Sequence, residues 1–127
     1  KDNIQIRMLT NALMLKKVMP KTKIKESIRH LDISIDAGDK ETYERLRLGG
    51  KWEVLLDNLD YVKQEFDCEV TLKFVLQRDN IDSVENFVEL VERYGFRGNA
   101  IRGLGNNEEL LRSQRNESST SNECQGK

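Results

Sequence analysis

The sequence predicts an α/β fold, a partial (βα) barrel fragment with parallel strands and about three to four βα units. Two observations support this prediction. Segments in which apolar and polar residues alternate, typical of strands, are separated along the chain by amphipathic helical segments. Strands that are joined by helices form parallel sheets with right-handed crossovers. The length, 127 residues, allows a two-layer core but falls short of the roughly 200 residues of a complete barrel.

The first predicted βα unit occupies about the first thirty residues. Apolar and polar residues alternate from Ile4, which predicts a strand that ends at Thr10 and Asn11. Apolar residues at helical spacing follow. Because proline lacks a backbone donor, we expect Pro20 to interrupt this helix and to start a second turn that carries Ile24 and Ile28.

The second unit contains a strand, a polar loop and two helices. Alternation predicts a strand over residues 31–36, with Leu31, Ile33 and Ile35 on one face and Asp32, Ser34 and Asp36 on the other. Asp39 is typical of an N-cap, so a short helix is expected from there to Arg47. Gly49 and Gly50 end it, and apolar residues recur at helical spacing from Lys51 to Phe66.

A third strand is predicted at residues 68–77, followed by a helix that ends before Gly95. Asp82 or Ser83 is the expected N-cap of this helix, because both side chains accept hydrogen bonds from a first helical turn. Its predicted apolar stripe consists of Val84, Phe87, Val88, Val91 and Tyr94. A weak fourth strand is predicted at residues 99–102.

Composition divides the chain into a barrel-like domain, residues 1–102, and a polar tail, residues 103–127. The tail is rich in Gly, Asn, Ser, Gln and Glu and has no apolar period beyond a helical turn around Leu110 and Leu111, so we expect it to be disordered.

Charge, hydropathy and cysteine usage exclude several function classes. The chain has 21 Lys and Arg against 22 Asp and Glu, so no overall field attracts nucleic acid or an anionic membrane. No apolar run approaches the roughly 20 residues that span a bilayer, and the N-terminus lacks secretory features. Cys68 and Cys124 lie far apart and do not suggest a disulfide framework. These observations predict a cytoplasmic protein.

One face of each predicted strand is polar, which is unusual for the packed interior of a barrel. Its members are Gln5, Arg7, Leu9 and Asn11 on the first strand, Asp32, Ser34 and Asp36 on the second, and Glu69, Thr71, Lys73, Val75 and Gln77 on the third. Such a face is costly unless it is solvated, paired or occupied by a ligand. Two interpretations stay open: a polar ligand site at the carboxyl ends of the strands, or an ion-pair ladder of Arg7, Asp32, Asp36 and Lys73.

Three segments carry a family resemblance: Ser34-Ile35-Asp36-Ala37 with Glu41-Thr42-Tyr43-Glu44, Arg47 and Gly49-Gly50; Thr10-Asn11-Ala12; and Phe74-Val75-Leu76-Gln77-Arg78-Asp79-Asn80. The first resembles the fourth-strand region of radical S-adenosylmethionine (radical SAM) enzymes, particularly those with a SPASM-type C-terminal extension. The others are similar to the Thr-Asn-Gly that ends the preceding strand and to the fifth strand with its exit loop. The resemblance covers roughly residues 4–102.

The resemblance implies a site for S-adenosylmethionine at the carboxyl ends of the strands. Ser34 matches the family's cofactor-contacting serine, and Asp36 could bind ribose hydroxyls. Arg47 stands near a cofactor-contacting arginine and could bind the methionine carboxylate, although a surface pair with Glu44 is the alternative. Asn11 and Gln77 could line the pocket or form turns.

The family's cluster-binding Cys-x-x-x-Cys-x-x-Cys does not occur in this sequence. The resemblance therefore implies an interior fragment of an enzyme whose 4Fe-4S cluster and S-adenosylmethionine generate a 5′-deoxyadenosyl radical, with an unknown peptide or small-molecule substrate. The alternative is a non-catalytic α/β binding or interaction module.

Overall fold

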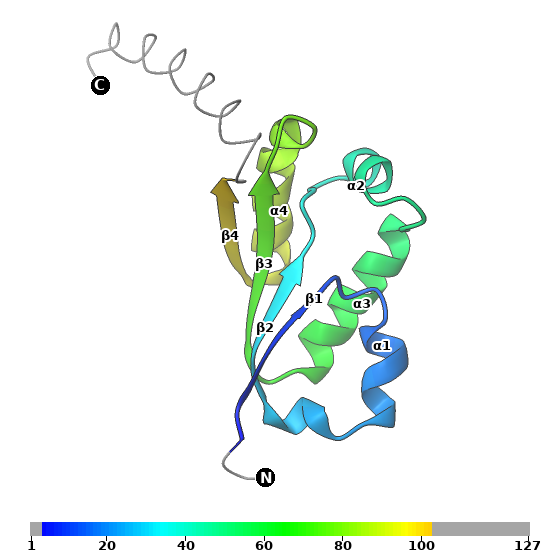
Figure 1. The fold of residues 1–127 in the computed structure, drawn as a ribbon, viewed down its shortest axis with the longest axis vertical. Helices are drawn as coiled ribbons and strands as arrows, with labels where there is room; N and C mark the ends of the chain where they lie inside the picture. The colour runs from blue at the N-terminus through cyan, green and yellow to red at the C-terminus, as the bar shows by residue number, and fades with distance from the viewer. Residues whose placement is uncertain (1–3, 103–127) are drawn as a thin grey trace, which may run out of the picture.

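Four of the alternating segments form one parallel sheet in the computed structural model, which describes residues 4–102 (Figure 1). The elements in chain order are β1 (Ile6–Thr10), α1 (Leu15–Val18), η1 (Met19–Lys21), η2 (Ile24–Ser27), β2 (Ile28–Ser34), α2 (Lys40–Leu46), α3 (Trp52–Glu65), β3 (Glu69–Leu76), η3 (Ile81–Ser83), α4 (Val84–Tyr94) and β4 (Arg97–Arg102), where η marks a short 3₁₀ helix.

The strand order in the sheet is the order in the chain, β1-β2-β3-β4, and every neighbouring pair is parallel. Right-handed crossovers between consecutive neighbours place all connecting helices on one face, as in a (βα) barrel. A doubly wound sheet would instead reverse its strand order and carry helices on both faces. The predicted fold class, a parallel α/β arrangement of consecutive βα units, is confirmed.

The core lies between the sheet and the helices α3 and α4. Leu31, Ile33, Leu72 and Phe74 of the central strands are fully buried, and the Phe74 ring lies 4.9 Å from that of Phe87 on α4. Burial of each such side chain stabilises the fold by about 1.5–3 kcal/mol. The helices therefore cover one sheet face, and the polar face of the strands is left without a covering layer among the described residues.

Two predicted helix ends are confirmed by their geometry. Asp39 is the N-cap of α2, where its Oδ1 accepts a hydrogen bond from the Thr42 N–H at 2.8 Å. Gly95 ends α4 in the left-handed region, with φ of 72°, which glycine adopts without a steric penalty. Pro20 lies in η1, and the helix before it ends at Val18, as predicted.

Other boundaries differ from the prediction. Ile28 begins β2 rather than ending a helical turn, because it pairs with Ile6 on β1 and its side chain is buried. Ser83 is the N-cap residue of α4, as predicted, but its hydroxyl donates to Asp39 instead of capping the helix, and Asp82 lies within η3. The fourth strand begins at Arg97, two residues earlier than predicted, in register with Thr71.

The predicted α4 stripe is correct except at one position. Val88 is 50% exposed, whereas Leu90, which the prediction omitted, is 2% exposed and packs in the core. The predictions for residues 103–127, including the tail and Cys124, lie outside the described residues. Within residues 4–102, none of the helices has the length and apolarity that a membrane crossing requires.

Candidate functional site

The carboxyl ends of β1 and β2 hold two residues in an uncommon backbone conformation. Ala12 has φ of 72° and Asp36 has φ of 61°, and they are the non-glycine residues with positive φ in the described part of the chain. The left-handed region costs most L-residues energy, and such strain tends to occur at functional sites. The ends of β1 and β2 therefore carry the kind of backbone strain that is typical of functional sites.

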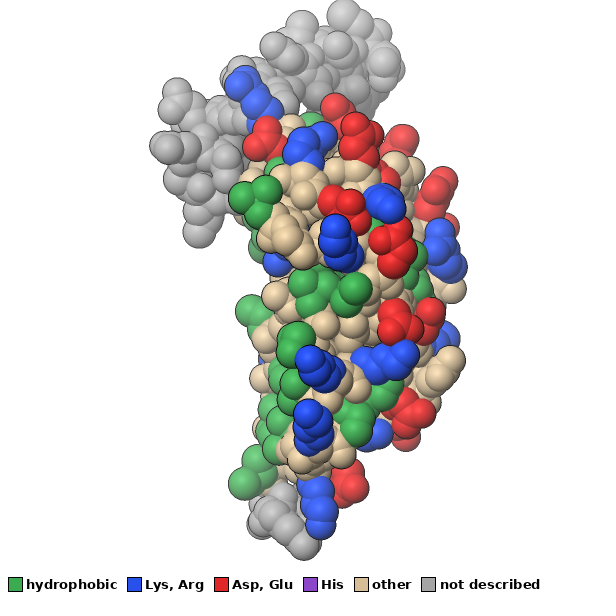
Figure 2. Space-filling model, turned by 90° about the vertical axis from the view of Figure 1, so that its right-hand side faces the viewer, with side chains coloured by type: hydrophobic (Ala, Val, Ile, Leu, Met, Phe, Trp, Pro, Cys, Tyr) green, Lys and Arg blue, Asp and Glu red, His purple; other side chains and the backbone are tan. Residues whose placement is uncertain are grey.

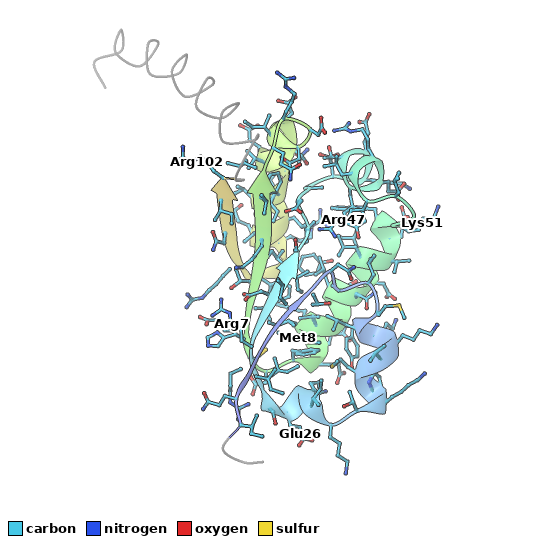
Figure 3. All side chains as sticks on the ribbon, viewed as in Figure 1. Arg7, Met8, Glu26, Arg47, Lys51 and Arg102 are labelled. Atoms are coloured by element: carbon cyan, nitrogen blue, oxygen red, sulfur yellow. The ribbon has the colours of Figure 1, made fainter. Side chains whose placement is uncertain are left out.

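Arg47, Ser34 and Asp36 meet at the end of β2. Arg47 follows α2 directly, and its Nη2 donates to the Ser34 carbonyl oxygen at 3.1 Å, to Ser34 Oγ at 3.3 Å and to Asp36 Oδ2 at 3.3 Å. Figure 3 places Arg47 between the end of β2 and the helices α2 and α3. The Arg47 and Asp36 side chains stay 27% and 22% exposed, so a ligand could reach them.

The alternative pairing of Arg47 with Glu44 is wrong. Glu44 Oε2 instead accepts the N–H of Trp52 at 2.9 Å, at the start of α3. Because Gly50 N–H donates to the Arg47 carbonyl at 2.8 Å, the glycine turn after α2 also helps to hold Arg47 in place. The local sequence thus directs the guanidinium toward the strand end rather than along the helix surface.

Asp36 joins two strands in addition to contacting Arg47. Its Oδ1 accepts the N–H of Val75 at 2.8 Å, and its carbonyl oxygen accepts from Asn80 Nδ2 at 3.1 Å. Asn80 is 1% exposed, donates also to the Val75 carbonyl at 2.9 Å and accepts the N–H of Gln77 at 2.8 Å. Asn80 is the main residue of this region that sequence reasoning missed, because its loop position suggests only a turn.

The other two predicted site residues are placed differently. Asn11 is exposed, and its Oδ1 accepts the N–H of Leu13 at 3.0 Å, the turn-forming role that was the alternative prediction. Gln77 follows β3 and its backbone is held by Asn80, but its side chain has no hydrogen bond to a described residue. The structure therefore brings Ser34, Asp36 and Arg47 together and leaves Asn11 outside their cluster.

The predicted ion-pair ladder forms only in part. Arg7 Nε lies 2.8 Å from Asp32 Oδ2 across β1 and β2, whereas Asp36 pairs with Arg47 rather than with a strand residue. Lys73 has no ion pair with any described residue. The Arg7 side chain is 63% exposed, so its pair with Asp32 contributes at most about 1 kcal/mol.

Metal ligands do not gather in residues 4–102, where no group of three or more His, Cys, Asp or Glu side chains could hold an ion. Burial raises the pKa of the Cys68 thiol, and His30 Nδ1 contacts Glu69 at 2.7 Å. Since the whole chain contains two cysteines, an iron–sulfur cluster would require ligands from outside it.

Charged side chains are interspersed over the helix-covered side, where Figure 2 shows basic and acidic groups close together. This mixed surface agrees with the balanced composition. The chain matches no protein-family model, and no curated protein matches it either.

Proposed function

We propose that this chain is an interior part of a radical SAM enzyme of the SPASM-containing group and contributes part of the pocket for S-adenosylmethionine and substrate. The observation that carries the proposal is the convergence of Arg47, Ser34 and Asp36 at the carboxyl end of β2. Active sites of (βα) barrels lie at this end of the strands. The sequential, one-sided sheet and the motif resemblance support the same assignment.

In this proposal each of the three side chains has a defined task. The Arg47 guanidinium binds the carboxylate of the cofactor's methionine, the Ser34 hydroxyl hydrogen-bonds a ribose hydroxyl, and Asp36 accepts from a ribose hydroxyl while it holds β3 through Val75. The bound cofactor, together with a 4Fe-4S cluster held by cysteines outside this chain, would supply the radical chemistry of the parent enzyme. The predicted cytoplasmic location, a compartment that keeps thiols reduced, suits such oxygen-sensitive chemistry.

One observation favours the alternative, a non-catalytic α/β binding or interaction module. Arg47 and Asp36 already satisfy each other and the backbone, so the cluster could serve only to join α2, β2 and β3. The two proposals differ in whether S-adenosylmethionine binds.

Titration of the chain with S-adenosylmethionine decides between the two proposals. NMR is used to monitor the titration, because we expect weak binding without the cluster. Ser34→Ala should weaken binding by about 1 kcal/mol through loss of one neutral hydrogen bond, and Arg47→Ala by about 1.5–3 kcal/mol through loss of a charge-assisted one. Arg45→Ala is the matched control, since Arg45 lies in the last turn of α2, two residues before Arg47, but donates to the Asp79 carbonyl at 2.6 Å.

The Arg45 variant should bind as the parent does. If Ser34→Ala and Arg47→Ala both leave the dissociation constant unchanged while the amide spectrum shows an intact fold, the site assignment is wrong. The cluster would then be structural, as the alternative states.

A further inference from the structure

The uncovered face of the sheet holds a row of three polar side chains on adjacent strands. Ser34 on β2 is in register with Lys73 on β3, and Lys73 is in register with Asn99 on β4. Neighbouring strands lie about 4.8 Å apart, so the hydroxyl, the ammonium and the amide can reach one small ligand together. Lys73 lies between Leu72 and Phe74, which are both fully buried under the helices, and therefore points to the opposite face.

Among residues 4–102, the charges around this row are paired with one another, apart from that of Lys73. Arg7 pairs with Asp32 at 2.8 Å, Arg97 pairs with Glu69 at 2.7 Å, and Arg47 pairs with Asp36 at 3.3 Å. Lys73 is partly buried and has no carboxylate within ion-pair distance among the described residues. The described side chains on this face therefore leave a positive charge at Lys73, in the middle of the row.

We propose that Ser34, Lys73 and Asn99 bind an oxyanion, a carboxylate or a phosphate, carried by the substrate. Lys73 supplies the charge, and the Asn99 amide donates to the anion's oxygen atoms. The Ser34 hydroxyl donates its one hydrogen to the anion, while its lone pairs accept from Arg47 and from the ribose hydroxyl of the proposed cofactor. The inference rests on the proposed function in one respect, because it takes the uncovered face as the inside of the barrel where the substrate lies. It leaves the cofactor's own carboxylate to Arg47, at the strand end.

A partly buried lysine without a counter-ion also has a structural explanation, in which its aliphatic stem covers neighbouring strands and its ammonium stays in water. The two explanations predict different results with small anions. If the Lys73 stem only covers the neighbouring strands, no anion site exists at Lys73. If Ser34, Lys73 and Asn99 form a preformed site, phosphate or acetate binds there and not at other lysines.

The test is an NMR titration of the full chain with inorganic phosphate and separately with acetate, at constant ionic strength with chloride as the balancing anion. We expect saturable shifts of the amides of Ser34, Lys73 and Asn99. Lys73→Met, which keeps the stem and removes the charge, should raise the dissociation constant about tenfold or more. Lys17→Gln, at an exposed position on α1, should leave it unchanged.

Lys73→Arg keeps a cation at the position and should retain binding, so it tests the proposal even if Lys73→Met fails to fold. Shifts that do not saturate, that spread over all lysines or that persist in Lys73→Met overturn the inference. Loss of phosphate and acetate binding with intact S-adenosylmethionine binding would refute only this anion site. The reverse result would refute the cofactor assignment and leave the anion site standing.

Discussion

Ala12 shows how the end of β1 is held in a costly conformation. Its side chain is fully buried at φ of 72°, a region that costs an L-residue roughly 1–2 kcal/mol. Thr10 Oγ1 accepts the Ala12 N–H at 3.0 Å, and Asn11 Oδ1 accepts the Leu13 N–H at 3.0 Å, so local hydrogen bonds hold the turn. The strained turn places α1 against α3 while β1 continues the sheet.

Replacement of Ala12 by glycine should change the free energy of unfolding by less than about 0.5 kcal/mol. Relief of about 1–2 kcal/mol of strain offsets the entropy that glycine gains in the unfolded state, about 0.4–1 kcal/mol, and the loss of a buried methyl, about 0.8 kcal/mol. Ala37 is equally buried but has no positive φ, so Ala37→Gly should cost about 1–2 kcal/mol. Urea unfolding measures both, and equal losses would contradict the strain argument.

At the scale of elements, Asp39 connects the starts of α2 and α4. Its Oδ2 accepts from the Ser83 hydroxyl at 2.6 Å and from Asn86 Nδ2 at 3.1 Å, while Oδ1 caps α2. Burial by itself raises the pKa of Asp39, but the hydrogen bonds from Ser83, Thr42 and Asn86 outweigh it and lower the pKa to about 2. The ionised form therefore stabilises the packing of both helices.

This lowered pKa predicts a pH-dependent contribution to stability. It is fully present above the ordinary value of 3.8 and is lost as the pH falls through about 2, where the folded state also binds the proton. Asp39→Asn should lower the free energy of unfolding by about 1 kcal/mol at pH 7, and this difference should shrink toward pH 2.

Urea unfolding of the parent chain and the variant at pH 7, 4 and 2 measures the effect. Asp82→Asn is the control, because Asp82 is exposed and its side chain has no hydrogen bond to a described residue. A difference for Asp39→Asn that does not vary with pH would contradict the assigned role.

Gly38 allows α4 to approach the loop after β2 closely. A Cβ at this position would overlap the backbone of Phe87 and would lie 2.6 Å from its Cα. At Gly98 a Cβ would lie 3.0 Å from a methyl of the Val91 side chain, which can move. We expect Gly38→Ala to cost about 3 kcal/mol and Gly98→Ala about 1 kcal/mol, measured by urea unfolding. A smaller loss for Gly38→Ala than for Gly98→Ala would show that α4 shifts freely.

At the scale of the whole molecule, the sheet formed by residues 4–102 has two open edges. In residues 4–102, β1 and β4 each pair on one side only, and every residue of β4 is exposed. Leu9 and Ile101, 69% and 47% exposed, lie on these edge strands. Unpaired edges of this kind template further strand pairing.

The isolated chain should therefore be marginally stable and prone to self-association. Thermal unfolding followed by circular dichroism, with size-exclusion chromatography over a range of concentrations, checks this expectation. A sharp, reversible, high-temperature transition of a monomer would show a self-sufficient domain and would favour the non-catalytic module.

By itself, the sequence determined the fold class, the order of strands and helices, the apolar face of the sheet and the Asp39 cap. These features depend on local periodicity and on capping chemistry, which short segments express alone. It also indicated Ser34, Asp36 and Arg47 as one site. That indication came from the family resemblance, and the three meet because α2 is a short helix between the end of β2 and α3.

Only the tertiary structure decided which partner each polar side chain takes. Asn80, Ser83 and Asn58 look like ordinary polar residues in the sequence, yet all three are buried and hydrogen-bond elements 40 or more residues away. Likewise Arg47 selects Ser34 over Glu44, and Lys73 has no carboxylate partner among the described residues. A hydrogen bond or ion pair depends on distances between segments remote in the chain, and these are set by the packing of the whole sheet rather than by local pattern.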